Sequence, residues 1–149
     1  TNRKSGQRPY RLSREVFDLA ASILLPDQIK NTSDIPVYIR ASIVVTWKDP
    51  SGNVYGQLPV ADTDYTISYG TGWTRQGDYW YCNSEVAVGA NTPELISSCT
   101  EVAGKAPKEN YRLSVEIIAE AIQSQPDRAV QQAWGVTISG GNVTAYSGN

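Results

Sequence analysis

The sequence predicts an all-β protein, a jelly-roll-like β-sandwich with one short helix in the C-terminal region. The run VYIRASIVVTWK, residues 37–48, alternates apolar and polar side chains with the period of two that a β-strand requires. Several shorter runs rich in β-branched and aromatic residues follow, separated by turns containing Gly and Pro. The chain has 149 residues, of which 40% are hydrophobic, and this suits one domain with one core.

We expect two parts in the chain. Residues 1–14 carry five basic side chains and no acidic one, which predicts a flexible basic tail, with a contact arm as the alternative. Residues 15–149 form the single β-sandwich domain. At its start, residues 14–25 fit either a helix capped by Ser13 or an extended apolar segment, and the pattern leaves both open.

The strands are predicted in order. In residues 37–48, one face carries Val37, Ile39, Ala41, Ile43, Val45 and Trp47. The turn DPSGN follows, then a partner strand over residues 54–60 that Pro59 interrupts. Further strands are expected over residues 65–69, 79–81 and 94–98.

The C-terminal region holds a long ambiguous segment, residues 111–122. Its length and the all-β context favour a strand over a helix, with Glu116 and Glu120 on the outward face. A short helix is expected to begin at Asp127 and to end at Gly135, with Trp134 as a plug for one end of the core. A hairpin around residues 140–142 ends the chain.

Composition excludes several classes of function. The chain has no histidine, so Ser-His-Asp and Cys-His catalytic groups and His-ligated zinc sites are impossible. The net charge of −2 provides no general attraction for nucleic acid, and no apolar run is long enough to span a membrane. Asp62 and Asp64 have the spacing of calcium ligands but lack the rest of that motif, so a polar turn is the preferred interpretation. We therefore expect no enzyme activity, no cofactor and no metal.

Two cysteines, Cys82 and Cys99, are too few for a structural zinc site. A disulfide between them would close a short loop and stabilise the fold by roughly 3 kcal/mol in the chain-entropy model. We expect this disulfide, and two separate buried thiols are the alternative.

Aromatic residues are concentrated between residues 65 and 81. Exposed aromatic side chains on a sandwich could stack on sugar rings or on a partner protein. The candidates for ligand contact are Trp73, Tyr79, Trp80 and Tyr81. The competing interpretation is that these side chains pack in the core.

Three segments in order carry a resemblance to a known family. The first holds Lys30-Asn31-Thr32-Ser33 and Tyr38-Ile39-Arg40, the second Trp73, Tyr79-Trp80-Tyr81 and Val88-Gly89, and the third Ala119-Glu120-Ala121-Ile122-Gln123 and Ala133-Trp134. Together they resemble the TasA/camelysin family of secreted bacterial proteins, which are exported with an alternate-type, SipW-dependent signal peptide. The resemblance covers roughly residues 24–138.

The resemblance implies a secreted jelly-roll subunit at the cell surface or in the extracellular biofilm matrix. Better-known relatives form fibres by donor-strand exchange, so the implied partner is another copy of the chain, and other matrix proteins or glycans are further partners. The donor segment would lie in residues 16–25, with Val16, Phe17, Leu19, Ala21, Ile23 and Leu25 as its apolar residues. The approach to the first motif is compressed here to LLPDQIKNTS, which departs from the family pattern. The metallopeptidase activity ascribed to camelysin-like members is not carried over, because the chain lacks histidine. The alternative function is a monomeric surface-displayed binding module or adhesin that uses exposed aromatic residues to contact glycans or a host protein.

Overall fold

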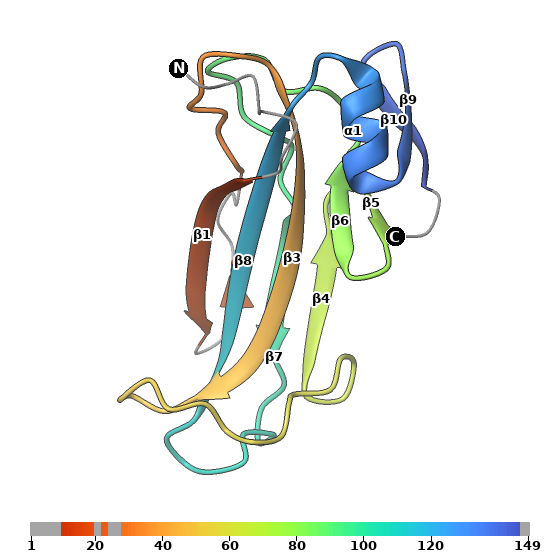
Figure 1. The fold of residues 1–149 in the computed structure, drawn as a ribbon. Coiled ribbons are helices and arrows are strands. Elements are labelled where there is room, and N and C mark those ends of the chain that lie inside the picture. The colour runs from red at the N-terminus through yellow and green to blue at the C-terminus, as the bar shows by residue number, and fades with distance from the viewer. Residues whose placement is uncertain (1–9, 20–21, 24–27, 147–149) are drawn as a thin grey trace.

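The protein is described by a computed structural model that covers residues 10–19, 22–23 and 28–146. It consists of antiparallel sheets and one short helix, which confirms the predicted all-β sandwich (Figure 1). The large sheet has the order β1 (Tyr10–Leu19), β8 (Arg112–Gln123), β3 (Val37–Lys48), β6 (Tyr79–Cys82) and β5 (Trp73–Gln76). The small sheet has the order β2 (Ser22–Ile23), β7 (Ile96–Glu101) and β4 (Tyr65–Tyr69).

The centre of the large sheet is the pair β3–β8. The two strands are antiparallel and in register from Val37↔Gln123 to Lys48↔Arg112, without a bulge. Because side chains alternate along a strand, one face of this pair carries only apolar residues over most of its length. That face packs against Leu95, Ile96 and Cys99 of the small-sheet side and forms the main core.

A second, smaller core lies on the opposite face of the large sheet. There the helix α1 (Asp127–Trp134) and the hairpin of β9 (Val136–Ser139) and β10 (Asn142–Tyr146) cover one end of β3 and β6 (Figure 1). Its buried members are Tyr38, Tyr81, Ile122, Val130, Trp134, Val136, Ile138 and Val143. The sheet is therefore buried on both faces at this end.

The helix ends where the sequence predicts. Gly135 has a φ of 67°, in the left-handed region that glycine adopts without a steric penalty, and its N–H donates to the carbonyl of Gln131 at 2.9 Å. Trp134, the last helical residue, is only 1% exposed. It is buried, but it fills the second core and does not plug an end of the main core.

The structure changes the prediction for the N-terminal region. The expected flexible tail over residues 1–14 is too long, because β1 begins at Tyr10 and pairs with β8 from there. Of the two alternatives for residues 14–25, the extended one is correct in the described part, which forms β1 and β2. The backbone N–H and C=O groups along the edge of β8 form hydrogen bonds with an extended segment, and these bonds stabilise the strand more than the local sequence pattern stabilises a helix.

Three further regions differ from the prediction. Residues 54–60 form no strand; Val54 makes an isolated bridge to Lys48, and Pro59 cannot donate to a ladder. β5 was not predicted, and β7 lies slightly later in the chain than expected. The segment 111–122 is a strand, as expected, and its alternative as a helix is rejected.

Candidate functional site

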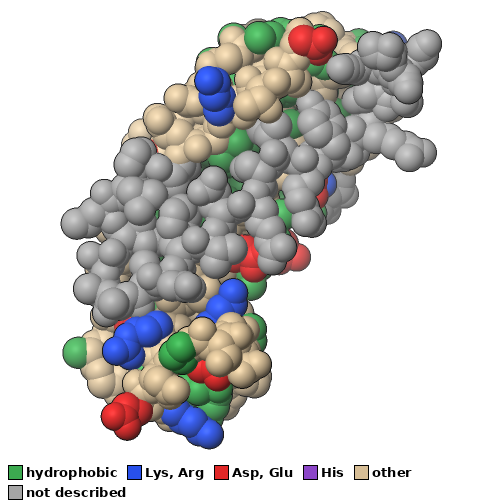
Figure 2. All heavy atoms as spheres, turned by 90° about the vertical axis from the view of Figure 1, so that its left-hand side faces the viewer, with side chains coloured by type: hydrophobic (Ala, Val, Ile, Leu, Met, Phe, Trp, Pro, Cys, Tyr) green, Lys and Arg blue, Asp and Glu red, His purple; other side chains and the backbone are tan. Residues whose placement is uncertain are grey.

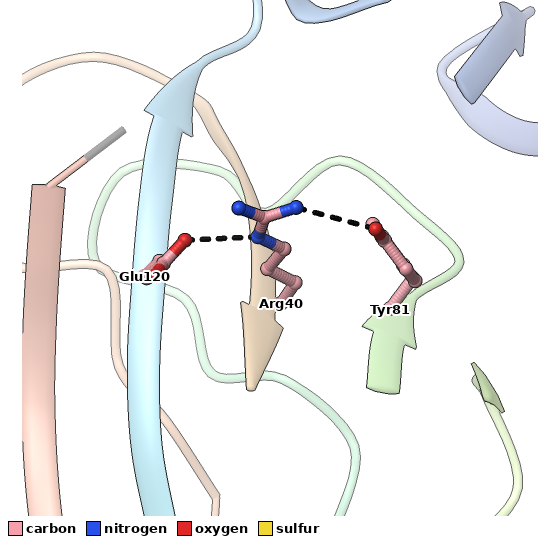
Figure 3. Close-up of polar contacts among 3 residues, drawn as sticks. All are labelled: Arg40, Tyr81 and Glu120. Carbon is pink, nitrogen blue, oxygen red and sulfur yellow. Dashed lines mark hydrogen bonds and ion pairs between the residues drawn. The ribbon is translucent and has the colours of Figure 1, made fainter. Parts of the chain in front are cut away.

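A single arginine organises the end of the large sheet beneath α1. Arg40 of β3 donates from Nε to Oε1 of Glu120 on β8 at 2.8 Å, and from Nη1 to the hydroxyl of Tyr81 on β6 at 3.2 Å (Figure 3). Its guanidinium carbon lies 3.8 Å from the ring centroid of Tyr79 and 4.7 Å from that of Trp134. The side chain is 12% exposed, so the charge is compensated by a carboxylate and by aromatic faces instead of bulk water.

The second core leaves two polar atoms without a described hydrogen-bond partner. These are the hydroxyl of Tyr38 and Nε1 of Trp134, both in side chains at most 1% exposed. Burial, with the nearby charges of Asp127 and Glu85, raises the pKa of Tyr38 to about 12. The phenol is therefore neutral at physiological pH, and it acts as a packing residue with a hydroxyl that the fold tolerates.

The first motif of the sequence is a structural turn. Asn31 is fully buried, and its side-chain amide donates to the carbonyls of Ile35 and Val86 at 2.9 and 3.0 Å. Its side-chain oxygen accepts from the backbone N–H and the hydroxyl of Ser33. Its backbone carbonyl accepts from Gly89, which has a positive φ of 78°. The KNTS motif thus ties the entry of β3 to the Val88-Gly89 turn of the second motif.

The third motif reaches the same end of the molecule. Ala119 to Gln123 pair with the start of β3, and Trp134 contacts Tyr81 edge to face with ring centroids 5.9 Å apart. All three motifs therefore converge around the start of β3. Their side chains tie strands together, and this arrangement provides structure rather than a reacting group. The sequence interpretation missed the role of Arg40, because alternation within each strand does not show that β3 pairs with β6 and places Arg40 opposite Tyr81.

The structure corrects half of the aromatic candidates. Trp73 is 7% exposed and donates from Nε1 to the carbonyl of Pro93, and Tyr81 is 1% exposed, so both are core residues. Tyr79 is half-buried under Arg40. Trp80 is half-buried and stacks on Tyr69 with ring centroids 4.1 Å apart, so it is the candidate that lines a groove. β6 has a core on each face, because Trp80 packs against the main core and Tyr81 lies in the second core.

The predicted disulfide is wrong. Cys82 and Cys99 are free and buried, on strands of different sheets. The thiol of Cys82 donates weakly to the carbonyl of Ser84 at 3.6 Å, within its own turn. Burial raises the pKa of both thiols, that of Cys99 to about 11. Each cysteine therefore behaves as a small apolar core residue that stays protonated.

The donor-strand candidates are placed within their own chain. Val16, Phe17 and Leu19 lie on β1, opposite Glu116, Val115 and Leu113 of β8. Ile23 lies on β2 opposite Cys99 of β7. Ala21 and Leu25 lie outside the described residues. The segment occupies one edge of each sheet.

The acidic candidates stay apart. Asp64 accepts a hydrogen bond from the N–H of Val60 at 2.8 Å, which makes the Asp62–Asp64 segment a closed polar turn. Within the described residues, no group of three or more Cys, Asp or Glu side chains could hold a metal ion. In the same residues, no helix has the length and apolar character needed to cross a bilayer. Glu120 is engaged with Arg40, which gives it a structural partner that the sequence did not predict.

We compared the chain with known protein families, curated proteins and solved structures. Scans against protein-family models and searches for similar curated proteins and similar solved structures gave no match. Function is therefore inferred from the fold and the contacts described above, together with the resemblance that the three sequence motifs carry.

Proposed function

We propose that the protein is a structural subunit of an extracellular filament of the biofilm matrix and that its subunits are joined by exchange of β1. The resemblance to the TasA/camelysin family motivates the class and the secreted location. One observation supports the mechanism: β1 is the terminal strand of the large sheet and is antiparallel to β8 over Tyr10–Leu19. A terminal strand can leave one sheet and complete another without any rearrangement of the strands between.

The energetics favour such an exchange. When β1 of one subunit pairs with β8 of the next, the backbone hydrogen bonds lost within the chain are regained between chains. β8 without β1 presents an open edge along most of its length, and such an edge pairs with any matching strand. Because every subunit has one donor and one acceptor, the exchange continues from subunit to subunit and forms a filament.

The surface suits a protein partner better than nucleic acid. Figure 2 shows the side of the molecule on which β1 lies, and the described charged side chains at its lower end include both signs. A uniformly basic surface, which binding to phosphate backbones requires, is not formed by the described residues there. The alternative role as an aromatic binding module is less favoured, since Trp73 and Tyr81 are core residues.

Cross-linking tests the exchange directly. Val16 and Glu116 are register partners on β1 and β8. Two single variants, Val16→Cys and Glu116→Cys, are mixed, and mild oxidation should join one to the other, because only pairing between chains brings these positions together. Non-reducing electrophoresis measures the product. Residues 82 and 99 are buried thiols in both variants, so the parent protein is the control for background cross-linking.

A register control sharpens the result. Val16→Cys mixed with Arg112→Cys, a position four residues away along β8, should give far less product. Negative-stain microscopy should reveal filaments that disappear when residues 1–25 are deleted. Filaments that persist without residues 1–25, or that form with no Val16–Glu116 product, would refute strand exchange through β1.

A further inference from the structure

β3 has two edges with different surroundings. On one side it pairs with β8 along its whole length. On the other side it pairs with β6 only at Arg40 and Ala41, and the next contact is the bond from the N–H of Tyr55 to the carbonyl of Trp47 at 2.9 Å. Between these points no described strand pairs with residues 42–46 on that side. Among the described residues, β3 therefore has an unpaired edge over residues 42–46, although it is a central strand of the sheet.

The backbone direction at this free edge can be worked out. Val37 exchanges two hydrogen bonds with Val86, and Trp47 accepts from Tyr55, both on the side away from β8. Because the pairing with β8 has no bulge, all odd-numbered residues of β3 direct their N–H and C=O to that same side. The groups of Ile43 and Val45 therefore face the open edge, whereas those of Ser42, Val44 and Thr46 face β8.

A groove of about 260 Å³ runs beside this edge. Its floor is formed by Ile43, Val45, Tyr65, Tyr69 and Trp80, all partly or fully buried. Ala61, Arg75 and Asp78 complete the lining and are exposed. The groove thus combines free ladder groups with an apolar floor, which are the two features that strand addition uses.

We propose that this groove is a second strand-binding site, distinct from the β1–β8 edge, and that it takes a short extended segment of another polypeptide. The segment pairs with Ile43 and Val45 and places two aliphatic side chains on Trp80 and its neighbours. The chemistry of the occupant follows from the free groups, since only a polypeptide offers N–H and C=O groups at the spacing of a strand.

The residues at the two ends of the free edge limit the length of the bound segment, and the groove lining limits its charge. Trp80 of β6 occupies one end of the edge and Tyr55 the other, so there is room for about five residues in extended form, roughly 17 Å. A straight strand as long as β3 of a second copy would collide with both. Residues 42–46 carry no charge, and the rim has one charge of each sign, Arg75 and Asp78. An uncharged segment therefore matches the groove, while an inserted charge would be desolvated without a partner.

Amide hydrogen exchange measured by NMR tests the proposal. In the free protein, the amides of Ile43 and Val45 should exchange much faster than those of Val44 and Thr46, which bond to β8. The probe is a blocked pentapeptide of alternating threonine and valine. At a concentration ten times its Kd it should slow exchange at Ile43 and Val45 about tenfold and leave Val44 and Thr46 unchanged. The same peptide with N-methylated valines keeps its side chains but cannot donate these bonds, and it should have no effect.

Matched variants locate the site. Val45→Lys places a charge in the groove and should abolish the effect of the peptide, whereas Val44→Lys, on the opposite face, should retain it. Equal protection of all four amides in the free protein would overturn the proposal. A peptide that changes the NMR chemical shifts of Trp80 without slowing exchange at Ile43 and Val45 would also overturn it. If protection of the Ile43 and Val45 amides rose with protein concentration in the absence of peptide, the occupant would be a second copy of the chain. That result would overturn the proposal of a different polypeptide. None of these readouts involves β1, so the result is independent of the filament experiment.

Discussion

The two halves of β3 share an alternating strand pattern but have very different surroundings. In the first half, Val37 to Ala41, both faces are covered and both edges are paired, by the main core, the second core, β8 and β6. In the second half, Val44 is 39% exposed, and no strand of the described residues pairs with the edge that faces away from β8. The comparison teaches that the same alternating pattern can form a rigid centre or a surface for strand addition, depending on what packs around it.

The largest difference in unfolding free energy between the two halves should come from a lysine placed in each half in turn, on the same face of the sheet. Ile122 lies on β8 opposite Tyr38, in the first half of β3. Ile122→Lys buries an ammonium group beneath α1, where the side chain is 0% exposed, and should cost more than about 4 kcal/mol of unfolding free energy. Val44→Lys should stay within about 0.5 kcal/mol. Urea unfolding followed by tryptophan fluorescence measures both. Similar losses for the two variants would remove the distinction between the halves.

A smaller contrast is expected for two tryptophans. Trp134→Ala leaves a cavity in the second core and removes the ring over Arg40, which should cost about 3–5 kcal/mol. Trp80→Ala, in the half-buried groove, should cost about 1–3 kcal/mol, because less area is buried and one stacked pair is lost. Thermal unfolding followed by circular dichroism compares them. A greater loss at Trp80 would mean that the groove, and not the second core, is the better packed region.

The smallest effect concerns the ion pair that crosses from β3 to β8. Glu120→Gln keeps an oxygen for Nε of Arg40 but removes the charge, so we expect a loss of about 1 kcal/mol. Glu109→Gln, at an exposed loop position, should have no measurable effect. Urea unfolding at about 0.1 M and 1 M salt measures both variants. The difference in unfolding free energy between Glu120→Gln and the parent should shrink at high salt because charges are screened. Equal stability of the parent and Glu120→Gln at low salt would show that Arg40 is held by its aromatic neighbours alone.

The sequence was informative where a pattern is local. The alternation in residues 37–48 and 111–122 predicted two long strands and their inward faces, and Gly135 with Trp134 predicted the end of the helix. It was less informative for a strand that is covered on both faces, because such a strand can have the same alternating pattern as a strand with one exposed face. The alternation of residues 79–81 is the same whether the side chains on one face meet water or a second core, so the sequence left Tyr81 open between ligand contact and core packing, and the structure places it in the second core. The spacing of the two cysteines in the sequence does not show how far apart they lie in the fold, and in the structure they are separate thiols.

By itself, the sequence determined the all-β class, the long central strands, the position of the short helix and the absence of histidine chemistry, because periodicity, turn residues and composition act locally. Only the tertiary structure decided that α1 and the β9–β10 hairpin build a second core, that Arg40 meets Glu120 and Tyr81, and that part of β3 has a free edge. These features depend on contacts between residues some 40 to 80 positions apart. The physical reason is that an alternating strand specifies which side chains share a face, whereas the elements that cover that face and pair with its edge are chosen by packing.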